Sequence, residues 1–363
     1  MMNNDFNQES RELVVGLDAG GTRTRAVLAA AADGRVLGEG AAGPGNALTV
    51  PLPRLTDHLA EALARAVPEY ARGRVAAVAG GFAGATGAAE DDPGRLNALT
   101  ALAAALRRLG ISTGSIGISS DIEAAFASAP GTPADGLALV AGTGAVAMRI
   151  TGRRCTATVD GDGWLLGDDG SGFWIGREAV RAALRMADGR GGATSLAGAV
   201  GRTLGLPREV LPGGRQPEAP PAGPGASRGG PGPDAPHGGP GALPGSATWS
   251  LADREAYRMH LLPVVMAEPP TRLARLAPLV AEAARAKDPV AGALLDEAAG
   301  QLTDTVRALM PQPGERVVAT GGLLGPGGPL TALLATRLQA LGLTLDWVAD
   351  GCAGSVALAR LLL

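Results

Sequence analysis

The sequence carries the same short pattern in its two halves, and this repeat limits the possible folds more than any other feature. An apolar run, a turn rich in glycine and threonine, and a second apolar run occur at residues 13–30 and again at residues 137–150. Runs of apolar and β-branched residues that flank such a turn are typical of β-hairpins. The chain is therefore expected to contain two related lobes, each of which opens with a hairpin.

Further predicted strands and helices follow each hairpin and define the fold class. In the first half, the patterns predict strands at residues 13–18, 24–30, 35–42, 75–79 and 115–119, and helices at residues 56–67 and 96–109. In the second half, they predict strands at residues 137–141, 145–150 and 316–320, and helices at residues 174–187, 194–204, from 251 onward, 272–285, 290–310 and about 353–362. This order predicts an α/β protein in which helices pack on the faces of mixed sheets.

Length and local composition indicate how the lobes divide along the chain. With 363 residues, the chain suits two domains of ordinary size. We expect an N-terminal lobe of residues 1–121 and a C-terminal lobe of residues 122–352. Residues 207–246 are crowded with proline and glycine and have no hydrophobic period, so they are predicted to form a disordered surface insertion in the second lobe.

Composition argues against several classes of protein. Charged residues interrupt every apolar stretch before it reaches the ~20 residues of a membrane span, and residues 1–11 lack the basic and apolar regions of a secretory signal. The net charge of -3 does not provide the basic surface of a nucleic-acid binder. We therefore expect a soluble, cytoplasmic protein whose partner is a small molecule rather than a membrane or a nucleic acid.

Cysteine and histidine are too scarce for several kinds of catalytic centre. Cys155 and Cys352 are far apart in the sequence and do not have the spacing of a disulfide framework or a zinc site, and we expect two structural thiols. The 3 histidines offer poor support for a histidine metal site or a Ser-His-Asp triad. Chemistry is therefore expected to depend on carboxylates, backbone amides and a cofactor.

The turn of the first hairpin has the features of a phosphate-binding loop. Asp18 ends the first predicted strand, and Gly20 and Gly21 let the backbone approach a ligand closely and present N–H groups to phosphate oxygens. Asp18 would then face the phosphates and a metal ion. Aspartate, glycine and a threonine such as Thr22 are also common in ordinary hairpin turns, so a purely structural alternative remains open for this turn taken alone.

Two more glycine-containing strand ends occur in the second half. Gly142 and Thr143 follow the apolar strand predicted at residues 137–141, so each lobe offers one glycine- and threonine-containing turn. Two facing hairpins can hold a triphosphate from both sides. Gly321 and Gly322 follow the strand predicted at residues 316–320, where the absence of side chains would let an adenine ring lie against the backbone.

Asp121 is the candidate catalytic base. It directly follows a short predicted strand and precedes an apolar stretch at residues 122–129. In the structural alternative, Asp121 is simply the N-cap of a helix. In the functional interpretation, its carboxylate accepts a proton from an attacking hydroxyl close to the γ-phosphate, and both roles can coexist in one side chain.

Residues 159–172 combine glycines, acidic residues and an aromatic in an order that does not suit a regular helix or strand. Sugars are recognised by carboxylates that hydrogen-bond hydroxyl groups and by apolar faces, and this segment supplies both. In the alternative interpretation, it is a long acidic turn in which Trp164 and Trp174 are core residues. Asn46, which follows a Gly-Pro-Gly sequence, is either a further polar contact or only a turn residue.

These motifs occur in an order that resembles a known family. The segments DAGGTRTR, SSDIEAA, VAGTGAVAM, DGWLLGDDGSGFWIGREA and VVATGGLL resemble the BadF/BcrA-type ATPase branch of the actin, Hsp70 and sugar-kinase superfamily. Within that branch, they are most similar to the N-acetylglucosamine kinase-like enzymes and the glucosamine kinases of actinobacteria. The resemblance extends over essentially the whole chain except the proline- and glycine-rich segment.

The resemblance implies a fold, two cofactors and a role for each matching residue. The fold would be two ribonuclease H-like lobes with a central cleft that close on the substrate, and the last helix, at 353–363, would join the N-terminal lobe of residues 1–121. The cofactors would be ATP and Mg²⁺. The implied roles are Asp18 as the metal-associated carboxylate, Asp121 as the base, Gly20, Gly21, Thr22, Thr24, Gly142 and Thr143 as phosphate contacts, Gly321 and Gly322 as adenosine contacts, and Asn46 and Asp168 as sugar contacts. Related kinases are often homodimers, and the family phosphorylates the 6-hydroxyl of its sugar.

Departures from the family pattern bear on the sugar. N-acetylglucosamine kinases typically carry Gly-Gly-Trp-Gly and Gly-Asp-Glu-Gly-Ser, whereas Asp162-Gly163-Trp164-Leu165 and Gly167-Asp168-Asp169-Gly170-Ser171 stand here. The lead-in to this segment is similar to that of glucosamine kinases, and carboxylates such as Asp160 or Asp162 suit an ammonium group better than an acetamide. The resemblance therefore favours a glucosamine kinase, with Asp160, Asp162 and Gly163 among its substrate-binding residues, over an N-acetylglucosamine kinase.

Three other functions remain alternatives. A sugar-sensing regulator would bind the ligand without turnover, but such proteins usually add a basic DNA-binding module, for which residues 1–13 are too short and too acidic. An activator of a radical dehydratase would need paired cysteines for an iron–sulfur cluster, and Cys155 and Cys352 lack that spacing. If the protein were a filament-forming relative of actin, the acidic segment at residues 159–172 would have no function.

Overall fold

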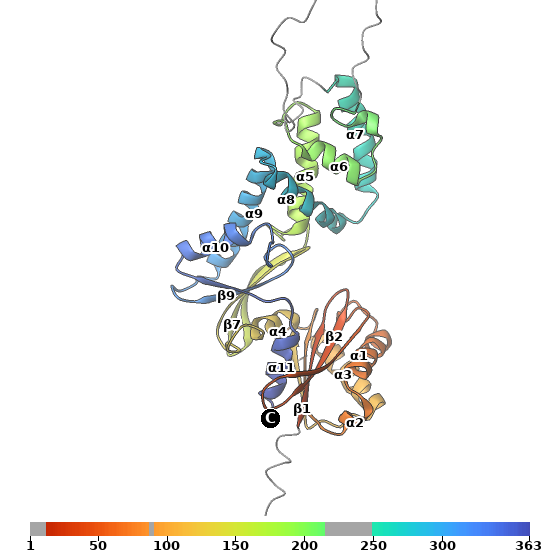
Figure 1. Ribbon diagram of the computed structural model, residues 1–363, viewed down its shortest axis with the longest axis vertical. Coiled ribbons are helices and arrows are strands. Elements are labelled where there is room, and N and C mark those ends of the chain that lie inside the picture. Colours follow the sequence, from red (N-terminus) through yellow and green to blue (C-terminus); the bar gives the residue numbers. More distant parts are fainter. Residues whose placement is uncertain (1–11, 87–90, 215–248) are drawn as a thin grey trace, which may run out of the picture. The chain divides into compact units, whose positions relative to one another are not determined.

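The computed structural model describes residues 12–86, 91–214 and 249–363 (Figure 1). The chain forms two compact units. The first comprises the residues up to Asp162 together with Gly300–Leu363, and the second comprises Gly163–Ala299. None of the helices in these described ranges is both long enough and apolar enough to span a membrane.

The first sheet of the first unit has five strands in the order β3-β2-β1-β4-β5. The strands are β1 (Leu13–Ala19), β2 (Thr24–Ala30), β3 (Val36–Ala42), β4 (Val75–Phe82) and β5 (Ser115–Ser120). The first three strands pair antiparallel as a meander, and β4 and β5 then add parallel to β1. All seven residues of β1 are buried, because helices cover the sheet on both faces.

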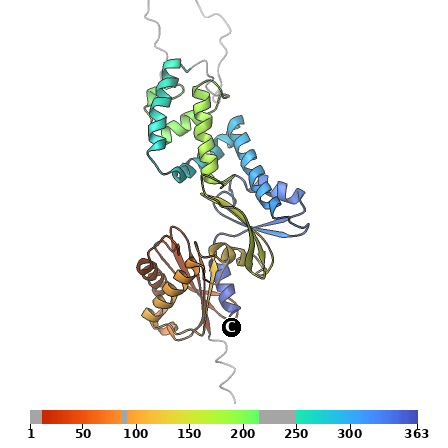
Figure 2. The same ribbon diagram turned by 180° about the vertical axis from the view of Figure 1, so that it is seen from behind.

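Helices on the two faces of this sheet bury separate apolar clusters (Figure 1 and Figure 2). On one face lie α1 (Leu52–Ala66), with its short continuation α2 (Glu69–Arg72), and α3 (Pro93–Leu109). On the other face, the final helix α11 (Cys352–Arg360) packs against β1 and β4. The last helix therefore packs on the first sheet.

The second sheet repeats the arrangement of the first. Its order is β10-β9-β6-β7-β8. Its strands are β6 (Gly136–Ala141), β7 (Ala145–Thr151), β8 (Arg154–Asp160), β9 (Arg316–Thr320) and β10 (Thr344–Trp347). Each sheet thus has an antiparallel three-strand meander whose first strand also pairs parallel with the fourth. This duplication confirms the predicted two-lobe α/β fold.

The helices that follow the fifth strand occupy equivalent places in the two halves. In the first half, α4 (Asp121–Ala127) begins directly after β5, and in the second half α11 begins five residues after β10. Two further helices of the second half, α9 (Pro289–Ala308) and α10 (Thr331–Ala340), precede β9 and β10 respectively. Three elements of the second half, α10, β8 and β10, were not predicted from the sequence pattern.

The second unit consists of helices, drawn in green and teal in Figure 2. They are α5 (Gly172–Ala187), α6 (Leu196–Thr203), α7 (Leu251–Met266) and α8 (Ala277–Arg285). Tyr257 is fully buried, and its hydroxyl donates a 2.8 Å hydrogen bond to the carbonyl oxygen of Ala197, which joins α7 to α6. Trp249 packs edge-to-face on Tyr257, with 5.1 Å between the two ring centroids.

Two boundaries predicted in this part of the chain are wrong. The predicted insertion at residues 207–246 begins too early, because Val210 and Leu211 are buried and the indole N–H of Trp249 donates to the Val210 carbonyl oxygen at 3.1 Å. Its later part, from residue 215, lies outside the described residues. The helix predicted at residues 272–285 begins as the 3-10 helix Pro270–Leu276, and α8 starts only after it, where Pro278 cannot donate an N–H group.

Candidate functional site

Asp18 stands near the end of β1, with only 9% of its surface exposed. The register of the hairpin places it directly opposite Arg25 of β2. The Arg25 guanidinium donates to the Asp18 carboxylate, with 3.0 Å between Nη2 and Oδ2. The pKa of Asp18 is raised above its ordinary value mainly by burial, which the charge of Arg25 opposes and the charge of Asp350 reinforces.

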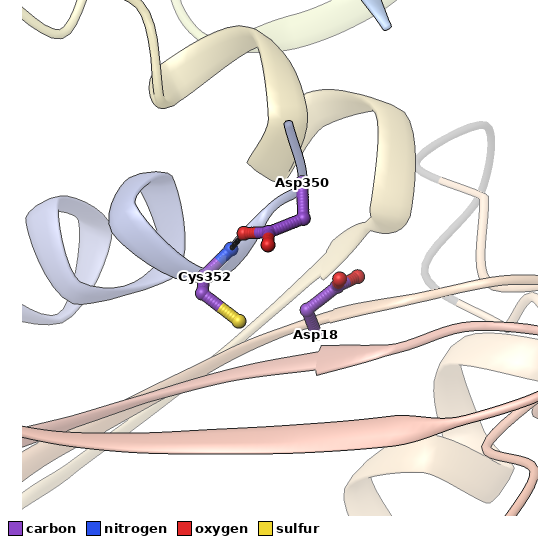
Figure 3. A group of neighbouring side chains, drawn as sticks. All are labelled: Asp18, Asp350 and Cys352. Carbon is purple, nitrogen blue, oxygen red and sulfur yellow. Dashed lines mark hydrogen bonds between the residues drawn. The ribbon is translucent and has the colours of Figure 1, made fainter. Parts of the chain in front are cut away.

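Asp350 is a second carboxylate at this place, and the sequence analysis did not identify it. It lies in the segment between β10 and α11, and the Arg25 guanidinium donates to its Oδ2 from Nη1 at 2.7 Å. The backbone N–H of Cys352 donates to its other oxygen at 2.9 Å, as Figure 3 shows. Oxygens of Asp18 and Asp350 and the Cys352 Sγ lie within 4.8 Å of one another.

Asp121 is the first residue of α4, but it is not the N-cap. Ser120 takes that place, because its hydroxyl accepts from the Glu123 N–H while the Glu123 carboxylate accepts from the Ser120 N–H. The Asp121 carboxylate accepts the N–H of Ile122, at 3.0 Å. The structural alternative that makes Asp121 a helix cap is therefore wrong.

Glu123 holds the start of α4 to the second sheet. It is almost fully buried, and its Oε1 accepts a 2.9 Å hydrogen bond from the Cys155 N–H in β8. Its Oε2 accepts from Ser120, as part of the capping pair. One buried carboxylate thus fixes the turn of helix that presents Asp121.

Three carboxylates share one cavity of about 220 Å³. Asp18, Asp121 and Asp350 line it together with Arg25, Thr320 and Gly351. The pKa of Asp121 is raised by burial and then by the negative charge of Asp18. A carboxylate with a raised pKa is a stronger base and is therefore better suited to accept a proton from a hydroxyl group.

The first phosphate-type turn is open at its tip. The Gly20 N–H donates to the Arg23 carbonyl oxygen, which closes the hairpin, whereas Gly21 and Thr22 are exposed. A Cβ added at Gly21 would meet no atom within 4 Å, so the backbone here is accessible to a ligand. Thr24, in contrast, is fully buried, and its hydroxyl has no hydrogen-bond partner among the described residues.

The second phosphate-type turn and the Gly321-Gly322 pair lie side by side. A Cβ at Gly321 would stand 2.2 Å from the Ala141 carbonyl oxygen, and its φ of 108° is in a region that side chains disfavour. Glycine is therefore required where β9 ends against the start of the Gly142-Thr143 turn. Gly322 and Gly142 face open space, and Thr143 is exposed.

Asn46 lies beside the first hairpin. The N–H of Gly45 donates to the Gly20 carbonyl oxygen at 2.9 Å, which docks this segment on the turn. The Asn46 side-chain oxygen accepts from the N–H groups of Leu48 and Thr49, both at 2.9 Å. Asn46 therefore has a role in the local turn, and its predicted contact with a sugar rests on the side-chain amide N–H groups.

The predicted sugar segment is divided by the structure. Asp160 is the last residue of β8, so the first part of the segment is a regular strand, contrary to the prediction. Asp160 and Asp168 both adopt positive φ angles, of 65° and 59°, which aspartate tolerates better than most residues. Asp162 follows β8 and is exposed.

Gly163 and Asp168 belong to the second unit, and their participation in one site with Asp121 stays a prediction. Within that unit, Ser171 caps α5 by accepting from the Trp174 N–H at 3.2 Å. Trp174 is buried, as the structural alternative expected, but Trp164 is 39% exposed and contacts the Phe173 ring edge-on at 6.0 Å. Trp164 is therefore only partly buried, unlike Trp174.

The donor atoms near Asp18 fit a small, hard divalent cation such as Mg²⁺. Mg²⁺ prefers carboxylate oxygens and water, and Asp18 and Asp350 provide such oxygens beside a cavity. The Cys352 thiol does not suit it. The pKa of that thiol is raised by burial and by the charges of Asp350 and Asp18, which keeps the sulfur protonated.

The family follows from comparison of the whole chain with known proteins. The model of the BadF/BadG/BcrA/BcrD ATPase family matches residues 15–336, which include both glycine-containing hairpins, Asp121 and the Gly321-Gly322 pair. The chain belongs to this family. Membership in the BadF/BadG/BcrA/BcrD ATPase family implies that ATP is a ligand, and it confirms the family that the sequence motifs resemble.

Solved structures confirm the fold. A candidate N-acetylglucosamine kinase from Chromobacterium violaceum matches with 22% identity and a TM-score of 0.60, over 96% of this chain and 99% of that one. A candidate N-acetylglucosamine kinase from Porphyromonas gingivalis matches with 19% identity and a TM-score of 0.63, over 96% and 98%. A hexokinase matches with 16% identity and a TM-score of 0.50, over 98% and 86%. Among curated protein sequences, none matches this chain.

Proposed function

We propose that this protein is an ATP-dependent sugar kinase that transfers the γ-phosphoryl group to the 6-hydroxyl of D-glucosamine. The observation that carries this proposal is the place of Asp121. Its carboxylate shares a cavity with Asp18, and Ser120 and Glu123 relieve it of the capping role. Burial and the charge of Asp18 raise its pKa, which suits a general base.

The proposed reaction moves one proton and one phosphoryl group. The Asp121 carboxylate takes the proton of the attacking sugar hydroxyl, the hydroxyl oxygen forms a bond to the γ-phosphorus, and the bond to the β,γ-bridging oxygen breaks to release ADP. The backbone N–H groups at Gly20–Thr22 and Gly142–Thr143 would bind phosphate oxygens, with Thr24 supporting the first turn. Mg²⁺ held by Asp18 would supply positive charge that offsets the phosphates, and Gly321 and Gly322 would face the adenosine.

Glucosamine is proposed because acidic groups gather at the predicted sugar segment. Asp160 is the last residue of β8, and Asp162 follows it by two residues. Carboxylates at these positions can bind the ammonium group of glucosamine by charge-assisted hydrogen bonds. Asn46, Gly163 and Asp168 would contact the sugar hydroxyls. We also propose a cytoplasmic homodimer whose lobes divide near residue 121, as the sequence predicts.

Two alternatives to a glucosamine kinase remain. An N-acetylglucosamine kinase is favoured by the two candidate N-acetylglucosamine kinases among the structures of the same fold. A sugar-binding regulator without turnover would share the binding site but would not need Asp121 as a base.

The test is ADP release from Mg-ATP in the presence of glucosamine, N-acetylglucosamine or glucose, with Asp121→Asn as the blank. Turnover with glucosamine alone supports the proposal, and turnover with N-acetylglucosamine alone supports the first alternative. Sugar binding by calorimetry without ADP release from any sugar would support the regulator.

A further inference from the structure

Arg25 joins the two carboxylates that face the cavity. Its Nη2 lies 3.0 Å from Asp18 and its Nη1 lies 2.7 Å from Asp350, so the two ends of one guanidinium fork bind one carboxylate each. Asp18 comes from β1 and Asp350 from the segment before α11, and Arg25 itself comes from β2. The guanidinium therefore stands where three elements meet, with its charge between the two acidic groups.

A divalent cation bound to Asp18 would compete with this guanidinium. The Asp18 carboxylate is 12% exposed, and its Oδ2 is already occupied by Arg25. Arg25 and the cation offer positive charge to the same carboxylate, beside the same cavity of about 220 Å³. Like charges at such close range repel, so the two cannot both be bound to Asp18 without a large loss of affinity for the cation.

Arg25 is also placed so that it can leave. Its side chain is 38% exposed, whereas the side chains of Asp18 and Asp350 are only 12% and 24% exposed. The Nε atom of Arg25 is buried and has no hydrogen-bond partner among the described residues, so the present position of the side chain does not satisfy all its donors. If the guanidinium moves towards solvent, its charge remains hydrated and water can bond to Nε.

We propose that Arg25 is a positioning residue. In the nucleotide-free protein its guanidinium binds the Asp18 carboxylate where the divalent cation would bind, and the cation displaces it. The inference rests on the proposed role of Asp18 as the metal-associated carboxylate. Arg25 then lowers the affinity of the free protein for the cation. It also holds Asp18 and Asp350 close together, through the bonds from Nη2 and Nη1, until the cation arrives with the nucleotide.

The proposal predicts the sign and the size of a change in cation affinity. Arg25→Gln removes one positive charge from a group of three carboxylates and one guanidinium. A unit charge acts on a dication about 5 Å away strongly enough, even with the dielectric constant of water, to change affinity roughly tenfold. Arg25→Gln should therefore bind Mn²⁺ at least roughly tenfold more tightly than the unchanged protein.

The experiment measures free Mn²⁺ by electron paramagnetic resonance in titrations of the full chain without nucleotide. Arg35→Gln is the matched control, because Arg35 is an exposed arginine that follows β2 and pairs with Asp33, away from the cavity. It makes the same change in net charge and should leave Mn²⁺ affinity unchanged. Arg25→Lys keeps the charge but loses the fork that binds both carboxylates, so its affinity should be intermediate. This variant provides the test if Arg25→Gln does not fold, as judged by circular dichroism.

The outcomes separate this inference from the proposed function. Tighter Mn²⁺ binding by Arg25→Gln, together with loss of binding in Asp18→Asn, supports the displacement. Unchanged or weaker binding by Arg25→Gln and Arg25→Lys, with loss in Asp18→Asn, overturns the displacement and leaves the role of Asp18 intact. Unchanged binding in Asp18→Asn overturns both, because the cation would then not be held by that carboxylate.

Discussion

Asp121→Asn should separate catalysis from stability at the start of α4. The carboxylate accepts the Ile122 N–H at 3.0 Å, and the amide oxygen of asparagine can accept the same bond. The capping pair of Ser120 and Glu123 does not involve the Asp121 side chain. The variant should therefore change the free energy of unfolding by less than about 0.5 kcal/mol, while losing about 10²–10⁴ in turnover through removal of the base.

Ser120, the residue before Asp121, should give the opposite result when it is replaced, with a loss of stability and little loss of turnover. Ser120→Ala removes the hydroxyl that accepts the Glu123 N–H at 3.1 Å, and loss of such a cap costs about 1 kcal/mol of stability. Because Ser120 makes no proposed contact with a substrate, its variant should lose much less turnover than Asp121→Asn. Denaturant unfolding measures the first quantity, and ADP release at saturating ATP and glucosamine measures the second.

Calorimetry completes the comparison by measuring ATP affinity, which Asp121→Asn should retain. If Asp121→Asn keeps full turnover, Asp121 is not the base. If the variant instead loses turnover together with several kcal/mol of stability, the Asp121 carboxylate supports the fold. That result would contradict the conclusion that Ser120 and Glu123 cap α4 without the Asp121 side chain.

Two further predictions concern the surroundings of Asp121. The charge of Asp18 contributes to the raised pKa of Asp121, so Asp18→Asn should lower that pKa. An NMR titration of the Asp121 carboxyl carbon in the nucleotide-free protein would then show its midpoint at lower pH. An unchanged midpoint would remove Asp18 as a cause. A Cβ at Gly354 would stand 1.9 Å from the Ala124 carbonyl oxygen, where α11 crosses α4, so Gly354→Ala should destabilise the protein by about 1–3 kcal/mol in denaturant unfolding. Gly300→Ala in α9 is the control: its Cβ would meet no atom within 4 Å, so it should stabilise by about 0.5–1 kcal/mol, and equal effects of the two variants would contradict the close crossing.

The sign of the linkage between pH and stability also follows from Asp121. A carboxyl group whose pKa is raised in the folded protein stabilises the fold when protonated, and this contribution is lost as pH rises through the raised pKa. The ionised form of Asp121 is therefore less favourable to folding than the protonated form. This is a further reason why Asp121→Asn is not expected to reduce stability at a pH above the raised pKa.

The strands and glycine turns that build the first sheet could be predicted because their sequence pattern is local. β1 and β2 are apolar runs on either side of a glycine-containing turn, and their predicted bounds agree with the structure to within one residue. β10 has only four residues, Thr344–Trp347, and two of these are polar, so it has no comparable pattern. β8 has mostly exposed or half-buried residues, which gives it little apolar signal.

The residues missed at the candidate site depend on those missed strands. Asp350 follows β10 as Asp121 follows β5, so its importance becomes visible only when the second sheet is known to repeat the first. Arg25 could have been found earlier, because the hairpin register places it opposite Asp18. Its bond to Asp350 joins residues 325 positions apart, and no local pattern predicts such a contact.

The most direct test of the central claim is to identify the product formed from Mg-ATP and glucosamine by phosphorus NMR and mass spectrometry. The proposed function predicts glucosamine 6-phosphate and an equal amount of ADP, with neither formed by Asp121→Asn. ADP formed without a phosphorylated sugar, or no ADP with any of the three sugars, would contradict it.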